Sequence, residues 1–287
     1  MKYISFQQLN KYRSNTFQSA SENRVLSKEQ AVEFVNKRGF VYFWPIKGFT
    51  LPSLWVAVAG DRPVASAHDD PGHITWNWKD SLLGERKWYY AKVLRKKATI
   101  IALDTVPYFY ALSRNYGSPG EDYLTQYEQG QLSIEEKIIY EVLFNIGPLD
   151  TVTLREKSRL TSKNSDSRFA RAMANLQADF KILPVGVVKA GGWRYAFAYE
   201  VVPHHYPDLA EKARLIHSND ARMHILRLYI ESLGAVKIRE IEKQFQWSSD
   251  QVEKCIQKLI RNEEILWNIG IGTSTEEWVA LVKLIEE

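Results

Sequence analysis

The sequence predicts a mainly α-helical protein with small β-hairpins, in the α+β class. Two observations lead to this prediction. Residues 132–199 have the pattern of three short helices followed by a β-hairpin, and residues 223–282 repeat that order of elements. Because this is the order of a winged helix-turn-helix, we expect tandem winged units along the chain.

The first helix of the central unit is expected at 134–144. Ser133 with Glu136 three residues later matches the capping-box pattern. Gly147-Pro148 ends this helix, because proline cannot continue a helix and glycine tolerates the left-handed cap. A second, short helix is expected at 151–159.

Asp166 opens the third helix of the unit. Its apolar stripe consists of Phe169, Met173, Leu176 and Phe180. The hairpin follows, with strands at 182–188 and 193–201 around the turn Ala190-Gly191-Gly192. In the DNA-binding form of such a unit, the third helix enters the major groove.

Cations are grouped in and just before this third helix. They are Arg155, Lys157, Arg159, Lys163, Arg168 and Arg171. Serine, threonine and asparagine residues lie among them, and such donors suit phosphates and base edges. The alternative is a solvated helix face without a ligand. The attached wing favours DNA, and we take Lys163, Arg168 and Arg171 as candidate DNA-binding residues.

The N-terminal part of the chain is expected to form an extended first unit. Residues 1–25 are polar and form an arm or a first helix. The elements expected after them are helices at 28–37 (capped by Ser27) and 51–59 (with Pro52 in its first turn), a loop at 61–73, helices at 76–83 and 86–94, a strand at 98–103 and a helix at 105–113.

The repeat near the C-terminus predicts helices at 223–233, 236–245 and 250–262, with a hairpin at 265–271 and 278–282. Its last part is rich in acidic residues, which favours a scaffold role over the main DNA contact. We expect an N-terminal arm or helix (1–25), a first, extended winged-helix-like unit (26–130), a second winged-helix domain (131–208) and a third (209–287).

Composition narrows the class of protein. The chain has 287 residues and a formal net charge of only +4, so the clustering of its charges is more informative than their sum. Cys255 is the only cysteine, which rules out an intramolecular disulfide; it lies on an apparent core face. The N-terminus has no apolar signal core and no segment is long enough to span a bilayer, so we expect a cytoplasmic protein without a membrane partner.

A second cationic stretch, 86–97, alternates with aromatic residues. Its cations suit phosphates and Trp88 suits stacking on a base, which favours nucleic acid. The alternative is that the aromatic residues are core and the cations are merely solvated. The candidate DNA-binding residues here are Arg86, Lys87, Lys92, Arg95, Lys96 and Lys97.

The segment His68-Asp69-Asp70-Pro71-Gly72-His73 places two carboxylates between histidines. Asp69 and Asp70 are candidates for activating water. A metal site is a weak alternative, because adjacent aspartates rarely bind one ion and no further ligands follow at a tetrahedral spacing. Turn and capping chemistry is the remaining alternative. We expect neither a metal nor a small-molecule cofactor.

The order of elements over residues 28–287 resembles the bacterial AlkZ-type DNA glycosylases. The most recognisable local pieces are Gly147 to Asp150, residues 160–183 and residues 222–234. The resemblance implies tandem winged helices in a C-shaped arrangement around double-stranded DNA, with repair of alkylated or crosslinked bases as the activity. The family usually adds a terminal β-barrel, and we expect none here because the sequence ends before one could form.

The resemblance also implies a Gln-hydrophobic-Gln or Gln-hydrophobic-Asp catalytic motif just after the first helix. The matching place holds Tyr42-Phe43-Trp44, without a carboxylate or an amide at either end. Tyr42 and Trp44 are therefore expected to stack on bases or wedge between them, and the negative group would come from Asp69 or Asp70.

Two functions remain open at this point: a glycosylase acting on damaged DNA, and a non-catalytic DNA-binding protein that senses damage or regulates. Protein binding through the wings is a third possibility.

Overall fold

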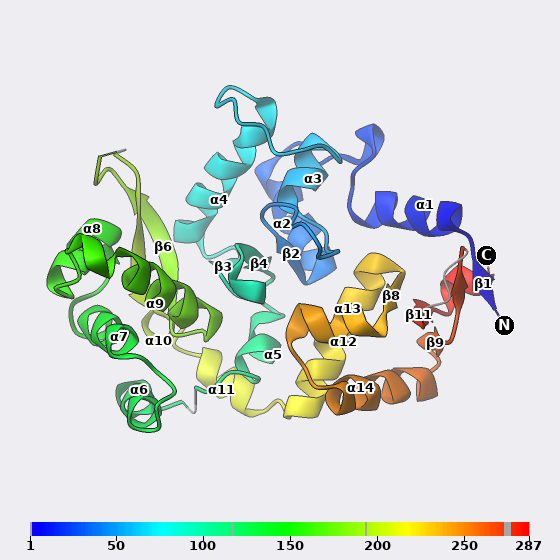
Figure 1. Ribbon diagram of the computed structural model, residues 1–287. Coiled ribbons are helices and arrows are strands. Elements are labelled where there is room, and N and C mark those ends of the chain that lie inside the picture. Colours follow the sequence, from blue (N-terminus) through cyan, green and yellow to red (C-terminus); the bar gives the residue numbers. More distant parts are fainter. Residues whose placement is uncertain (1, 116, 193, 273–276, 287) are drawn as a thin grey trace. The chain divides into compact units, whose positions relative to one another are not determined.

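The computed structural model describes residues 2–115, 117–192, 194–272 and 277–286. The chain forms two compact units whose segments alternate along the sequence (Figure 1). Unit 1 consists of Met1–Trp76, Ile100–Thr105 and Ser218–Glu287, and unit 2 consists of Asn77–Thr99 and Val106–His217. Unit 2 is thus inserted, in two pieces, into unit 1. The domain boundaries expected at 130/131 and 208/209 stay a prediction.

Unit 2 contains the central winged pattern (green in Figure 1). Its elements are β3 (Tyr89–Ala91), η3 (Leu94–Lys96), α5 (Val106–Tyr110), α6 (Pro119–Glu128), α7 (Ile134–Ile146), β5 (Leu149–Asp150), α8 (Thr151–Lys157), η4 (Lys163–Ser165), α9 (Asp166–Ala178), β6 (Ile182–Val188), β7 (Ala196–Val201), α10 (Val202–His205) and α11 (Leu209–Arg214). Strand β7 lies between β5 and β6 and runs antiparallel to both. The expected helices and wing are therefore present; Trp193, expected to begin the second strand, lies outside the described residues.

The apolar stripe predicted for the third helix forms the core of the winged pattern. Phe169, Met173 and Leu176 are buried together with apolar residues of α7 and β7. The placement of Phe180 on the same stripe is wrong, because α9 ends at Ala178 and Phe180 packs against Phe109 and Tyr110 instead. Burying a side chain of this size stabilises the fold by about 1.5–3 kcal/mol. The stripe thus fixes which face of α9 is left for solvent or a ligand.

The ends of α7 show why the helix starts and stops where the sequence indicates. The predicted capping box is confirmed: Glu136 N–H donates to Ser133 Oγ (3.2 Å) and Ser133 N–H donates to the Glu136 carboxylate (2.8 Å). The left-handed cap expected at Gly147 is wrong, because its backbone is extended (φ −67°). Glycine is needed there because the backbone packs closely on the preceding turn: a Cβ at this position would lie 2.5 Å from the Leu143 carbonyl oxygen.

Unit 1 contains the elements from both ends of the chain. They are β1 (Tyr3–Ile4), α1 (Phe6–Thr16), η1 (Ser21–Asn23), α2 (Lys28–Arg38), β2 (Phe40–Tyr42), α3 (Leu54–Ala59), η2 (Pro71–His73), α12 (Ser218–Leu233), β8 (Ala235–Lys237), α13 (Ile238–Phe245), α14 (Ser249–Arg261), β9 (Ile265–Trp267), β10 (Gly270–Ile271), β11 (Trp278–Leu281) and α15 (Lys283–Glu286). Two further elements, α4 (Ile74–Glu85) and β4 (Thr99–Ile101), lie where the chain passes between the units.

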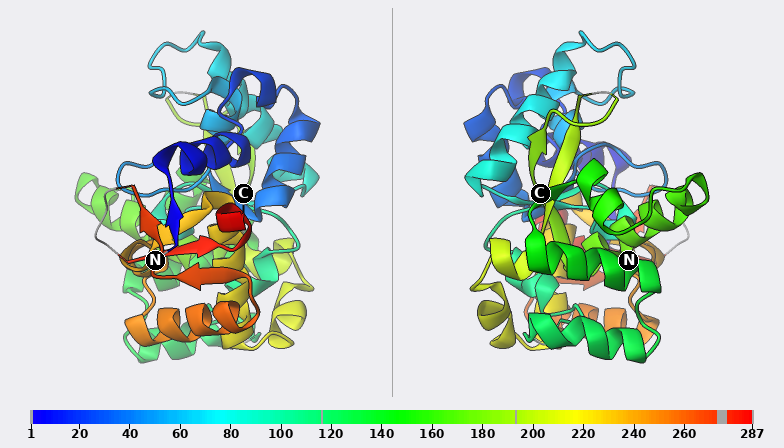
Figure 2. Two further views of the ribbon diagram at one scale, coloured as in Figure 1. Left: turned by 90° about the vertical axis from the view of Figure 1, so that its right-hand side faces the viewer. Right: turned by 90° about the vertical axis from the view of Figure 1, so that its left-hand side faces the viewer.

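The repeated pattern near the C-terminus is present in unit 1. Strand β11 pairs antiparallel with β8 and with β9, which forms the expected hairpin sheet. Strand β1 pairs in parallel with β10, so the first residues of the chain join the last strands (blue beside orange in Figure 2). Within the described residues, no helix is long and apolar enough to cross a membrane.

Three expected elements are wrong in detail. Residues 86–94 form strand β3 and the one-turn helix η3, because Trp88, Tyr89 and Tyr90 are all buried; a strand covered on both faces can bury three consecutive residues. Pro52 lies outside α3: its carbonyl accepts the Tyr42 N–H (2.9 Å). Residue 236 is in strand β8, paired with Val279, so the second helix of the repeat begins only at residue 238.

Candidate nucleic-acid interface

The polar face of α9 carries the cations that the sequence singled out. Arg168 and Arg171 are exposed and lie one turn apart, and Asn175 follows after another turn on the same face. Lys163, in the one-turn helix before α9, is also exposed. Two guanidinium groups therefore lie along one line of the helix, which suits a row of phosphates. The Asn175 side chain is half-buried, and its Nδ2 donates to the Glu136 carboxylate.

The two arginines differ in their electrostatic surroundings. Arg168 Nη1 lies 2.9 Å from Glu135 Oε1, at the start of α7, with side-chain exposures of 55% and 12%. Within the described residues, Arg171 has no carboxylate at ion-pair distance. Arg171 is therefore the more available of the two for a phosphate, whereas Arg168 must first release its partner.

Arg155 has a different role from the one its position in the cationic run indicated. Its guanidinium donates to the Leu160 carbonyl oxygen (2.9 Å and 3.1 Å) and pairs with Asp166. It also lies 5.1 Å from the centre of the Phe169 ring. Arg155 thus holds the turn between α8 and α9 in place and positions the start of the third helix.

The stretch 86–97 brings further cations to unit 2. The side chains of Arg86, Lys87, Lys92, Lys96 and Lys97 are exposed, and that of Arg95 is partly exposed. Lys96 Nζ donates to Asn175 Oδ1, and Lys92 N–H donates to Gln177 Oε1 (3.2 Å), so the end of this stretch packs on α9. The structure therefore brings Lys96 to the same helix as Arg171, which the sequence did not indicate.

Within unit 2, a buried lysine of α4 holds the wing. Lys79 Nζ, whose side chain is 1% exposed, lies 2.7 Å from Asp80 Oδ1 and donates to the Tyr195 hydroxyl (3.0 Å). The Tyr195 hydroxyl in turn donates to the Asp80 carboxylate (3.0 Å), and the Phe197 ring lies 4.3 Å from the amine. Burial lowers the pKa of Lys79, while Asp80 opposes that shift. This anchor was missed from the sequence, because lysine is rarely buried and Tyr195 lies 115 residues from Asp80.

In unit 1, aromatic residues gather around Trp44. Its ring centre lies 5.5 Å from that of Trp55, 5.6 Å from that of Trp76 and 6.3 Å from that of His73. Trp44 is half-buried and Trp76 is 37% exposed. Part of this aromatic cluster (Trp44, Trp55, His73 and Trp76) is therefore open to a flat ligand.

The stacking role expected for two other aromatic residues is not compatible with their positions. Tyr42 is fully buried and Trp88 is 1% exposed, so both pack in the core rather than face a base. Burial of large aromatic side chains contributes strongly to stability, which explains their presence without a ligand. Trp44 is the remaining stacking candidate of the three.

The two candidate carboxylates in the loop before α4, Asp69 and Asp70, have different surroundings. Asp70 is held by Arg62 through two hydrogen bonds (2.6 Å and 3.0 Å), and it accepts the Gly72 N–H (2.8 Å). The hydrogen bonds from Arg62 lower the pKa of Asp70, so this carboxylate has a capping role in the turn. Asp69 and His68 are exposed. Within the described residues, no group of three His, Cys, Asp or Glu side chains could hold a metal ion.

Comparison with known proteins places the chain in a family. A family model described as AlkZ related matches residues 25–246. The chain belongs to the AlkZ-related family. The resemblance found in the sequence is thereby confirmed.

A solved structure has the same fold as this AlkZ-related chain. It is the Streptomyces sahachiroi DNA glycosylase AlkZ, with 12% sequence identity and a TM-score of 0.59; the match covers 99% of this chain and 71% of that one. No curated protein sequence matches the chain. At this identity the likeness shows the fold, and the mainly helical α+β class expected from the sequence is confirmed.

At Tyr42, where the resemblance implied a catalytic amide or carboxylate, this AlkZ-related chain has a buried side-chain hydrogen bond. There the Tyr42 hydroxyl accepts a hydrogen bond from Gln244 Nε2 of α13 (3.0 Å). Both residues are buried. The two positions are 202 residues apart, so no local sequence signal could have indicated the contact. An amide is therefore present beside Tyr42, contributed by a helix that the sequence interpretation treated as scaffold.

Proposed function

We propose that this protein binds double-stranded DNA and recognises altered bases, as a DNA-repair protein of the AlkZ-related family. The observation that supports the proposal best is the pair of exposed arginines, Arg168 and Arg171, on one face of α9, where Lys96 joins them through its contact with Asn175. Lys163, Arg86, Lys87, Lys92, Arg95 and Lys97 add to the positive charge of the same unit. Cations grouped in this way attract phosphates irrespective of sequence.

The aromatic cluster in unit 1 supports the recognition of altered bases. An extruded or unpaired base can stack on an aromatic ring, and each such contact contributes about 1–3 kcal/mol. Trp76 is exposed, Trp44 and His73 are half-buried, and Trp55 is buried, so the two accessible tryptophans are Trp44 and Trp76. Damage lowers the cost of extruding a base, so such a surface favours damaged over intact DNA.

The test measures binding of the purified protein to a labelled duplex over a range of salt concentrations. Intact duplexes and duplexes with one alkylated or unpaired base are compared. We expect the logarithm of affinity to fall steeply with the logarithm of salt, by about 0.9 for each phosphate neutralised. We also expect Trp44→Ala to reduce the preference for the altered duplex more than the affinity for the intact one. Affinity that does not change with salt would contradict the proposal.

A second candidate function is hydrolysis of the N-glycosidic bond. Asp69 supports it, because this exposed carboxylate lies four residues before His73 of the aromatic cluster. A carboxylate near the sugar would stabilise the developing positive charge and orient water. Asp70 is the weaker candidate, since Arg62 already neutralises it. The assay is release of the base from alkylated and crosslinked duplexes by the wild type and by Asp69→Asn. If the wild type releases none, the non-catalytic function is favoured.

A further inference from the structure

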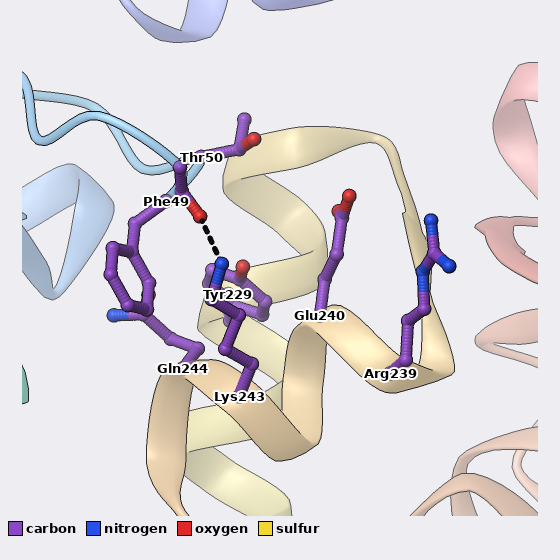
Figure 3. Close-up of a pocket in the computed structure, with 8 residues that line it drawn as sticks. Phe49, Thr50, Tyr229, Arg239, Glu240, Lys243 and Gln244 are labelled. Atoms are coloured by element: carbon purple, nitrogen blue, oxygen red, sulfur yellow. Dashed lines mark hydrogen bonds between the residues drawn. The ribbon is translucent and has the colours of Figure 1, made fainter.

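A pocket in unit 1 lies on the helix that carries Gln244. Its volume is about 360 Å³. It is lined by Gly48, Phe49, Thr50, Tyr229, Arg239, Glu240, Lys243 and Gln244. Figure 3 shows α13 presenting Arg239, Glu240 and Lys243 on one side, with the loop of Phe49 and Thr50 opposite. Small-molecule pockets start at about 300 Å³, so this one is of a size for a single ring system and its substituents.

The lining changes character from the inside of the pocket outward. Gln244 and Tyr229 are each 1% exposed, Glu240 is half-buried, and Arg239 and Lys243 are exposed at the rim. The helix period explains this sorting, since Glu240 and Gln244 are four residues apart, as are Arg239 and Lys243. A carboxylate is therefore available inside the pocket, and positive charges lie at its entrance.

Neighbouring contacts hold these groups in place. Lys243 Nζ donates to the Gly48 carbonyl oxygen (3.0 Å) and lies 4.7 Å from the centre of the Phe49 ring, which fixes the loop against α13. Gln244 is oriented by the Tyr42 hydroxyl. Burial lowers the pKa of the Arg13 guanidinium, and the Glu240 carboxylate opposes that shift. Glu240 therefore lies within electrostatic reach of a buried cation, in a pocket with cationic residues at its rim.

We propose that this pocket binds one nucleotide, with its base against Glu240 and its phosphate against Arg239 and Lys243. A carboxylate accepts a hydrogen bond from an exocyclic amino group on a base edge. At the rim, the guanidinium of Arg239 suits a phosphate through two parallel hydrogen bonds, and the ammonium of Lys243 suits it as a point charge. The nucleotide comes either from free solution or from DNA by extrusion, and only the second source rests on the proposed function.

The first arm of the experiment uses free nucleotides. Binding of each of the four 2′-deoxynucleoside 5′-monophosphates is measured by calorimetry, with inorganic phosphate as a control. We expect saturable binding of at least one base. Glu240→Gln keeps the shape of the side chain and removes its charge, and it should weaken that binding about tenfold, since a hydrogen bond to a charged group is stronger than one to a neutral group. Glu242→Gln, on the same helix but outside the pocket lining, is the matched control and should bind as the wild type.

The second arm uses a duplex with 2-aminopurine at one position, whose fluorescence rises when the base leaves the stack. A rise that Glu240→Gln reduces and Glu242→Gln does not would identify an extruded nucleotide as the ligand. Free binding without a rise would identify a free nucleotide. Equal behaviour of the two variants in both arms, or inorganic phosphate binding as well as every nucleotide, would overturn the proposal. Because the first arm needs no DNA, its result is independent of whether the protein binds duplexes.

Discussion

Neutralising Glu135 is expected to increase the affinity for DNA. Glu135 pairs with Arg168 at 2.9 Å, and its own side chain is only 12% exposed. Partly exposed ion pairs contribute about 0.2–1 kcal/mol, so breaking this one costs Arg168 up to about a fivefold loss in phosphate affinity. The variant Glu135→Gln removes that cost, and we expect up to about fivefold tighter binding at low salt.

The neighbouring arginine provides the comparison. Arg171, on the same face of α9, has no such partner among the described residues. Arg171→Ala should therefore weaken binding more than Arg168→Ala in the wild type, and the two losses should become equal once Glu135 is glutamine. Each arginine lost should also reduce the steepness of the salt dependence by about 0.9.

The assay is fluorescence anisotropy of a labelled duplex at several salt concentrations, with all four combinations of Glu135→Gln and Arg168→Ala. Such a cycle isolates the energy of the pair from the effect of each residue alone. Thermal unfolding of each variant serves as the folding control, since exposed substitutions change stability by less than about 0.5 kcal/mol. Unchanged affinity in Glu135→Gln together with an unchanged salt dependence in Arg171→Ala would refute the assignment of this face to DNA.

Further predictions concern stability and chemistry. Burial lowers the pKa of Lys181 from 10.5 to about 8, so Lys181 loses its proton at a lower pH in the folded state than in the unfolded state. The free energy of unfolding, measured with urea, should therefore rise by about 2 kcal/mol from pH 7 to 9.5 in the wild type relative to Lys181→Met. A difference between the two proteins that does not change with pH would contradict this. Tyr195→Phe removes the hydroxyl that contacts Lys79 and should destabilise the protein by about 1 kcal/mol in the same assay; an unchanged midpoint would show that the wing is not anchored there. If the protein releases bases, Asp69→Asn should abolish base release without changing the melting temperature. Asp70→Asn should lower the melting temperature and leave base release intact. The reverse pattern would show that Asp70 is catalytic and that Asp69 stabilises the loop.

The winged pattern could be predicted because its signals are local. Ser133 and Glu136 are three residues apart and cap α7 by themselves, and the stripe of Phe169, Met173 and Leu176 defines the buried face of α9. Each of these signals is complete within one helix, so no knowledge of the rest of the fold is needed. The exposure of Arg171 then follows from the same periodicity.

The candidate sites could not be predicted to the same depth, because they depend on tertiary contacts. The burial of Trp88 decides whether it stacks on a base or packs in the core. An alternation of cations and aromatic residues in the sequence does not reveal which of these side chains are buried. Asp69 and Asp70 are equivalent in sequence and differ only because Arg62 reaches one of them. The contact between Tyr42 and Gln244 joins two segments that the sequence assigns to different winged units.

The insertion of unit 2 into unit 1 has a consequence for the order of folding during synthesis. All segments of unit 2 have been made once His217 is added, whereas unit 1 still lacks everything from Ser218 onward, including the strand that pairs with Tyr3 and Ile4. Domains fold as units and N-terminal ones first as the chain emerges from the ribosome. Here the middle of the chain can fold before its beginning, and the N-terminal strand must wait unpaired for a partner made more than 260 residues later.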